Sequence, residues 1–145
     1  MWRNVGVLIG GFIVTEVVSN IYSSIVGWLY DIGMITHFHL FSFVRFFGSY
    51  LDFAISLFAG GLFIGLLAKT HRLILTLLLV SVYFAFGLWA YLYFLPHMLK
   101  DVPMPVNHYK VLEWVAENLV ILVSAFAGSM LGNHIITRRR NRQSN

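Results

Sequence analysis

Four long apolar runs, separated by short polar or proline-containing stretches, dominate the pattern of residues along the chain. A helix needs about 20 predominantly apolar residues to cross a bilayer, and each of these runs is long enough. The pattern therefore predicts an all-α, polytopic membrane protein that forms a single bundle of four transmembrane helices. The predicted spans are 5–29, 46–68, 73–95 and 114–136, followed by a basic cytoplasmic tail over 137–145.

The stretches between the runs have the residues expected of breaks. Asp31 to Gly33 closes the first run, "KTHR" at 69–72 predicts a tight basic turn, and three prolines make 96–107 non-helical. The polar positions from His39 to Ser56 recur every three or four residues, as on one face of a helix. This segment either extends the second helix outward or lies along the membrane interface.

Composition agrees with a membrane protein. Hydrophobic residues make up 59% of the chain, charged residues 11%, and the mean hydropathy is +0.77. A soluble domain has about 25% charged residues, so this chain lacks the polar residues to cover a water-soluble globule. Cysteine is absent, which excludes a disulfide framework, a thiolate metal site and a cysteine nucleophile.

Lysine and arginine are unevenly divided between the two sides of the predicted bundle. The positive-inside rule then places both termini in the cytoplasm, as a multi-pass protein of the bacterial inner membrane. Contact with anionic lipid explains the tail "RRRNRQSN" better than nucleic-acid binding does. The cytoplasmic set is Arg3, Lys69, Arg72, Arg138, Arg139, Arg140 and Arg142, against Arg45, Lys100 and Lys110 outside.

Small residues concentrate in the cytoplasmic half of the predicted bundle. Three helices carry a GxxxG pair, which lets helix backbones approach closely in lipid. We therefore expect the inner half of the bundle to be tightly packed. The glycines expected at helix contacts are Gly6, Gly10, Gly61, Gly65, Gly128 and Gly132.

Polar residues lie mostly toward the outer half of the predicted bundle, and Glu16 lies at the boundary between the glycine-rich inner half and this polar outer half. At about 1.5 Å per residue it lies roughly 16 Å into the first span, near the midplane, where a charge costs at least about 2.5 kcal/mol. No Lys or Arg lies at matching depth, so we expect a protonated or water-contacting carboxyl. The candidate ion- or substrate-binding residues are Glu16, Asn20, Asp52 and Glu117, the last two near the outer boundary.

These polar residues have two interpretations that the sequence leaves open. They would line a vestibule open to the outer face, or they would form a hydrogen-bonded seam with no cavity. Glu16 is correspondingly either a functional carboxylate or a protonated hydrogen-bond donor that joins helices.

The stretch "GGFIVTEV" at 10–17 resembles the first helix of small multidrug resistance transporters. Those four-helix proteins exchange protons for cationic drugs, so the resemblance implies that Glu16 is the proton- and substrate-binding carboxylate. It covers about one helix. The first loop here is long and aromatic, and the third helix has no matching tryptophan-and-glycine motif.

A second resemblance covers more of the chain. With the glutamate-containing first helix, "AGGLFIGLLA" and "AGSMLG" resemble uncharacterised small four-helix bacterial membrane proteins, which implies an architecture but no activity. In addition, "FAGGLFIG" at 58–65 echoes "FAGSMLGN" at 126–133. The echo indicates either two related helical hairpins or an independent choice of small packing residues.

No motif of an enzyme occurs: a nucleophile elbow, a phosphate-binding loop and H-E-x-x-H are all missing from the sequence. We expect no cofactor and no metal, although His37, His39, His97 and His108 leave an outer-side metal site open. The expected function is a non-enzymatic bundle or accessory subunit of a membrane complex, which contacts lipid and either a membrane-protein partner or further copies of itself. The alternative is a small proton- or cation-coupled transporter that uses Glu16.

Overall fold

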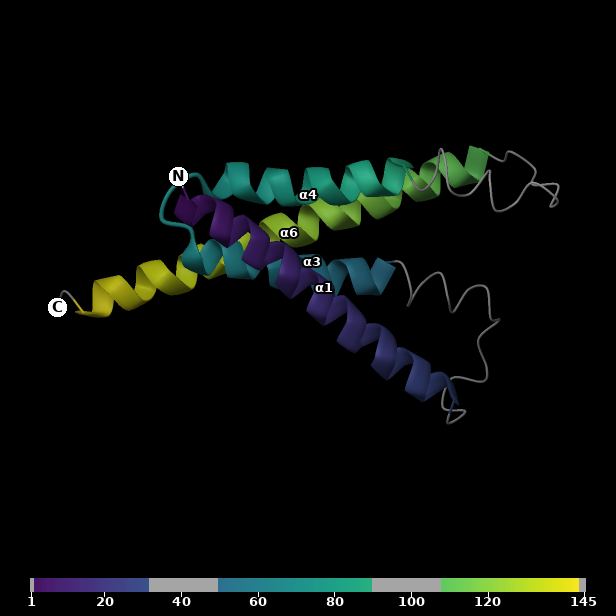
Figure 1. The fold of residues 1–145 in the computed structure, drawn as a ribbon, viewed down its shortest axis with the longest axis horizontal. Coiled ribbons are helices and arrows are strands. Elements are labelled where there is room, and N and C mark those ends of the chain that lie inside the picture. The colour runs from purple at the N-terminus through teal and green to yellow at the C-terminus, as the bar shows by residue number, and fades with distance from the viewer. Residues whose placement is uncertain (1, 32–49, 90–107, 144–145) are drawn as a thin grey trace.

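The described part of the chain consists of helices joined, between α3 and α4, by a short turn. The computed structural model describes residues 2–31, 50–89 and 108–143. These residues form four helices, and Figure 1 shows them lying along one another as an elongated bundle. The helices are α1 (Trp2–Asp31), α3 (Asp52–Leu67), α4 (Arg72–Trp89) and α6 (His108–Gln143).

Three of the helices are long and apolar enough to cross a membrane, namely Trp2–Leu29, Arg72–Trp89 and Trp114–Gln143. This confirms the helical class and shows that three of the four predicted spans coincide with helices of sufficient length and apolarity to cross a membrane. The fourth helix, α3, has 16 residues, fewer than a full crossing needs. The predicted span 46–68 begins outside the described residues, as do the segment 39–49 and the proline-rich stretch 96–107. Four crossings and their orientation stay predictions.

Helix α3 is the centre of the bundle. It packs against α1 on one side and most extensively against α6 on the other. Its side chains Leu57 and Ile64 are completely buried. The buried core continues onto α4 through Leu79 and onto α6 through Ala125. A short, almost wholly apolar helix can occupy this central place because its neighbours surround it on several sides.

Glycines bring the backbones of α3 and α6 into direct contact. A Cβ atom added to Gly61 would collide with the backbone of Ala125, and one added to Gly128 would collide with the carbonyl of Phe58. Gly65 and Gly132 have equally close backbone neighbours on the opposite helix. Van der Waals packing of this kind is a main source of helix association in lipid.

The first helix uses glycine differently from the prediction. Among the described residues nothing lies within 4 Å of a Cβ added to Gly6, so Gly6 makes no close helix contact there. Gly10 faces the ring of Phe63. The closest backbone approach of α1 to α3 falls instead at Gly11 and Gly60, where a Cβ on Gly60 would lie 2.9 Å from the Gly11 carbonyl oxygen. This pair spans two helices and therefore forms no GxxxG motif.

The turn between α3 and α4 closes one end of the bundle, as "KTHR" predicts. The N–H of Ala68 donates to the carbonyl of Ile64 (2.8 Å), and His71 then takes a left-handed backbone with φ of 59°. Arg3, at the start of α1, donates to the carbonyl of Leu67 at the end of α3 (3.0 Å). Arg3 and the basic turn are thereby held at the same end of the molecule.

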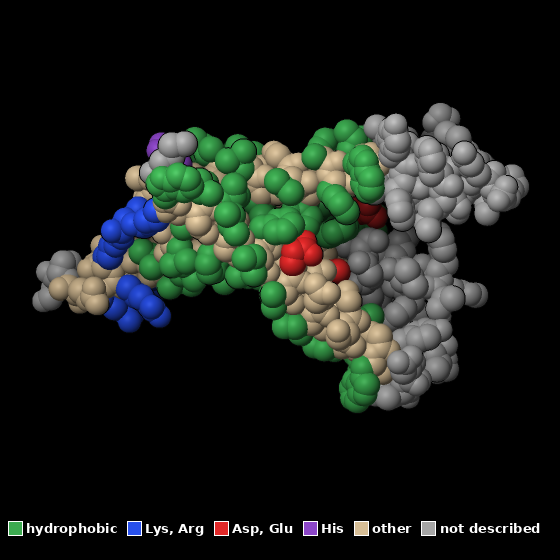
Figure 2. All heavy atoms as spheres, in the orientation of Figure 1, with side chains coloured by type: hydrophobic (Ala, Val, Ile, Leu, Met, Phe, Trp, Pro, Cys, Tyr) green, Lys and Arg blue, Asp and Glu red, His purple; other side chains and the backbone are tan. Residues whose placement is uncertain are grey.

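Many large hydrophobic side chains are exposed on the surface of the bundle, as in proteins that are surrounded by lipid. Figure 2 shows hydrophobic side chains spread over the face, with Lys and Arg gathered toward the end that carries the C-terminus. The C-terminal half of α1 diverges from the other helices in Figure 1. Only 17% of the most apolar 18-residue stretch of α1 is buried by the rest of the described chain, so most of this helix is exposed.

Candidate functional site

A hydrogen bond between two helices defines the centre of the candidate site. The hydroxyl of Tyr83, on α4, donates to Oε1 of Glu16, on α1, with an oxygen–oxygen distance of 2.6 Å. Both side chains are half-buried. The ring of Phe12 lies one turn earlier on α1, with its centroid 5.7 Å from that of Tyr83. The carboxyl of Glu16 therefore faces the helix bundle rather than only lipid.

Asp52 lies beside this pair, at the first turn of α3. The hydroxyl of Ser19, on α1, donates to Oδ2 of Asp52 at 2.8 Å. Asp52 is only 8% exposed, and its second oxygen, Oδ1, is buried with no hydrogen-bond partner among the described residues. A buried carboxylate oxygen without a partner is costly, since burying a polar group forfeits its hydrogen bonds to water.

The sequence predicts Asp52 near the outer boundary of the bundle, and the structure buries its side chain against α1. The reason is the orientation of α3: its first turn directs Asp52 toward α1, where Ser19 supplies a donor. We call Glu16, Ser19, Asp52 and Tyr83 the carboxyl cluster. Within it, Glu16 and the Ser19 that donates to Asp52 lie three residues apart on α1, so the two carboxyl groups are held by neighbouring positions of one helix.

Thr15 and Gly60 bring α1 and α3 close together near the cluster. Thr15 is 1% exposed, and its hydroxyl donates to the carbonyl of Gly11 at 2.9 Å. The same hydroxyl occupies the space that a Cβ on Gly60 would need. The missing side chain of Gly60 lets α1 approach α3 closely, and further along the same interface Ser19 bonds to Asp52.

Basic side chains do not neutralise the cluster. No salt bridge to Glu16 or Asp52 occurs among the side chains of residues 2–29, 50–89 and 114–143. Figure 2 shows acidic side chains in the middle of the face and Lys and Arg toward the C-terminal end. With no basic partner among the described side chains, protons or a bound cation are two ways in which the cluster could be neutralised.

The other two candidates from the sequence lie elsewhere. Asn20 is exposed, and its amide nitrogen donates to the backbone carbonyl of Glu16 at 2.8 Å, so it bonds to its own helix. Glu117 is half-buried on α6, whereas the hydrogen bonds that build the cluster come from α1, α3 and α4. The structure thus brings together Glu16 and Asp52 of the four.

Sequence reasoning missed Tyr83 as a partner of Glu16. Tyr83 lies in an aromatic-rich stretch, "VYFAFGLW", that looks like lipid contact or an aromatic belt. Its position in the middle of an apolar run was a usable signal, because a phenolic hydroxyl at that depth needs a hydrogen-bond partner.

Metal ligands do not assemble in the part of the chain that the structure describes, where no three His, Asp or Glu side chains form a group. His37, His39 and His97 lie outside those residues. Comparison with protein-family models, curated proteins and solved structures found no match for this chain.

Proposed function

We propose that this chain is a small, non-enzymatic integral membrane protein whose carboxyl cluster binds a proton or a small cation. In this proposal the four helices cross a bacterial inner membrane and both termini face the cytoplasm. The proposal extends the function expected from the sequence, because it assigns the buried polar residues a task rather than a purely structural role.

The observation that carries the proposal is the buried oxygen Oδ1 of Asp52, which has no hydrogen-bond partner among the described residues. Its carboxyl group bonds to Ser19 of α1, three residues along the same helix from Glu16, the second carboxyl group of the cluster. Two carboxylates in a site of low dielectric repel each other and lack the solvation of water. A proton or a cation removes both costs at once. Binding is coupled to the helices, since Glu16 and Asp52 come from α1 and α3 and Tyr83 bonds from α4.

The test compares carboxyl variants in lipid nanodiscs. Difference infrared spectroscopy follows the protonated-carboxyl band while pH, Na⁺, K⁺ or the lipophilic cation tetraphenylphosphonium is varied. Glu16→Gln and Asp52→Asn should each remove part of the titrating band, and the double variant should remove the part that responds to the added cation. Glu117→Gln, a carboxyl variant on α6, should leave the Glu16 and Asp52 contribution in place.

Thermal unfolding of the same samples separates binding from folding. If the double variant unfolds like the wild type and still shows the full band and the same cation response, the carboxyl cluster is not the binding site. Loss of the band in a stable protein supports the proposal.

A second candidate function, as an accessory subunit, has its own observation in α1. Its diverging half exposes the apolar residues Ile21, Ile25 and Trp28 together with polar Ser23. Polar side chains on transmembrane helices bond well across helix interfaces, so this mixed face suits a transmembrane helix of a partner protein. In this proposal α1 inserts its diverging half against such a helix.

Because the chain has no cysteine, single-cysteine variants report contacts cleanly. Ser23→Cys should cross-link to a membrane protein of different mass in its native membrane, and exposed Ser81→Cys on α4 serves as the control. A cross-linked product of twice the chain's mass would indicate a second copy instead. A protein that stays uncross-linked and monomeric counts against a subunit role.

A further inference from the structure

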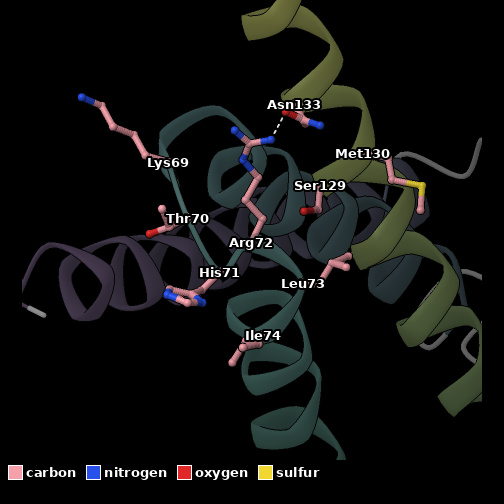
Figure 3. A pocket seen from close by; sticks show the side chains of 9 residues that line it. All are labelled: Lys69, Thr70, His71, Arg72, Leu73, Ile74, Ser129, Met130 and Asn133. Carbon is pink, nitrogen blue, oxygen red and sulfur yellow. Dashed lines mark hydrogen bonds between the residues drawn. The ribbon is translucent and has the colours of Figure 1, made fainter.

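A hollow lies at the basic end of the bundle, away from the carboxyl cluster. It has a volume of about 580 Å³ and is bounded by the α3–α4 turn and by α6. Figure 3 shows its lining, in which Lys69, His71 and Arg72 come from the turn and the start of α4, and Ser129 and Asn133 come from α6. Three basic side chains thus share one hollow with polar groups from a second segment.

Arg72 fixes the shape of this hollow. Its Nε donates to the carbonyl of Ala68 at 2.6 Å, and its guanidinium also donates to the side-chain oxygen of Asn133 on α6. Figure 3 shows the Arg72 side chain directed toward Asn133. The guanidinium has five N–H donors, so these two bonds leave donors for a further acceptor.

Lys69 and His71 complete the rim and are both exposed. In Figure 3 the Lys69 side chain extends away from Arg72 into open space, where its ammonium is accessible. His71 adopts φ of 59°, a left-handed conformation that is unfavourable for a non-glycine residue and that tends to occur at functional positions. The turn therefore places two accessible cationic or hydrogen-bonding groups beside a fixed guanidinium.

The sequence segments that form the hollow contain no acidic residue that could balance these positive charges. The chain has six acidic residues, and none lies within 53–100 or 118–145, the stretches that contain the turn and the inner part of α6. The six are Glu16, Asp31, Asp52, Asp101, Glu113 and Glu117. Lys69 and Arg72 therefore have no carboxylate counter-charge from the segments that build the hollow.

The hollow also sits at a particular depth. The apolar part of α3 ends at Leu67 and that of α4 begins at Leu73. In the membrane arrangement proposed above, on which this step rests, the residues between them would lie at the boundary between lipid tails and water. This is the level at which phospholipid phosphates lie. Leu73, Ile74 and Met130 contribute apolar surface to the same hollow, which suits a ligand with an acyl chain beside its phosphate.

We propose that this hollow binds the phosphate group of an anionic ligand, and its depth favours an anionic phospholipid headgroup over a free phosphate as the source. Arg72 would contact the phosphate oxygens with its remaining donors, since guanidinium and phosphate form strong charge-assisted hydrogen bonds. Lys69 would add a mobile point charge from the rim. This site is separate from the carboxyl cluster and does not depend on its function.

Native mass spectrometry of the purified full chain tests the proposal by counting bound phospholipids. Micelles contain phosphatidylglycerol or, for comparison, phosphatidylcholine, and inorganic phosphate is added in a third arm. We substitute Lys69→Gln and His71→Asn rather than Arg72, because Arg72 also holds the turn. Asn keeps the left-handed conformation accessible. Arg139→Gln, an exposed tail residue, is the control for general loss of positive charge.

The wild type and Arg139→Gln should each retain one phosphatidylglycerol in preference to phosphatidylcholine. Lys69→Gln should weaken this binding about fivefold, the effect of one basic residue near an anionic headgroup, with a further loss on adding His71→Asn. Displacement by inorganic phosphate with no preference between the lipids would support the same site with a soluble phosphate source. Equal retention by wild type and Lys69→Gln, or an equal loss in Arg139→Gln, would overturn the proposal.

Discussion

The hydroxyl of Tyr83 donates a hydrogen bond to Oε1 of Glu16 across the interface of α4 and α1, at 2.6 Å. The two residues are 67 positions apart in the sequence. This bond connects a carboxyl near the middle of the first span to a helix that has few other contacts with α1. It therefore contributes to both the stability of the bundle and the chemistry of the carboxyl cluster.

Removing this donor should destabilise the protein. Tyr83→Phe keeps the ring and its contact with Phe12 but deletes the hydroxyl. Interhelical hydrogen bonds in membrane proteins contribute about 0.6 kcal/mol on average and up to about 1.7 kcal/mol. We expect a loss of that size in the free energy of unfolding, measured by thermal or denaturant unfolding in one detergent.

Tyr22 provides the matched control. Its hydroxyl is buried and has no hydrogen-bond partner among the described residues. Tyr22→Phe should leave the free energy of unfolding unchanged or raise it, because it removes a buried polar group that gains nothing from the fold. If Tyr22→Phe costs as much as Tyr83→Phe, the bond to Glu16 is not the cause of the loss.

The close contact of α3 and α6 should not tolerate even one added methyl group. In Gly61→Ala the new Cβ meets the backbone of Ala125, which cannot move as a flexible side chain does. Overpacking of this kind costs about 1–3 kcal/mol. The expected result is a lower midpoint of thermal unfolding and weaker protection of α6 amides from hydrogen exchange.

Gly6→Ala makes the same chemical change where the described residues leave open space. Alanine is a better helix former than glycine, so this variant should be as stable as the wild type or slightly more stable. Equal destabilisation by Gly6→Ala and Gly61→Ala would show that the cost comes from the helix backbone and not from the contact with α6.

Much of the helical architecture could be predicted because it depends on local signals. Apolar runs predict helices of spanning length in any membrane protein, and the basic turn at 69–72 follows from its composition. Gly61 and Gly65 could be identified as packing residues for a similar reason. A GxxxG pair, however, shows only that a helix face permits close approach. It does not show which helix packs against that face. For this reason Gly6 was expected at a helix contact, whereas the close approach of Gly11 and Gly60 was not predicted.

The carboxyl cluster depended on information that the sequence does not carry locally. The depth of Glu16 followed from counting residues along one helix, and its lack of a basic partner followed from composition. Its bond to Tyr83 required knowing that α1 meets α4, and the burial of Asp52 required the rotation of α3 toward Ser19. Both are properties of how helices pair, and several pairings satisfy the same hydrophobic pattern.

A buried hydroxyl pair should couple α4 to α6. Thr76 is completely buried, and its hydroxyl lies 3.0 Å from that of Ser129 while also donating to the carbonyl of Arg72. Thr76→Val and Ser129→Ala should each lower the free energy of unfolding, by about 1 kcal/mol. The double variant should cost less than their sum by about 0.6 kcal/mol, the coupling typical of such bonds in membranes. Strict additivity would show that the two hydroxyls do not interact.

The two hydrogen bonds that Arg72 donates, to Ala68 and to Asn133, should keep the α3–α4 turn from opening. Arg72→Lys keeps the positive charge, but an ammonium on a flexible stem cannot reproduce a fork that bonds Ala68 and Asn133 at once. Losing one such bond costs about 1.4 kcal/mol, so hydrogen exchange of the turn amides should become about tenfold faster. Exchange within the buried middle of α3 should stay the same, since local opening of the turn does not require global unfolding. Arg142→Lys on the exposed tail should change neither, and unchanged exchange in Arg72→Lys would mean that the charge alone holds the turn.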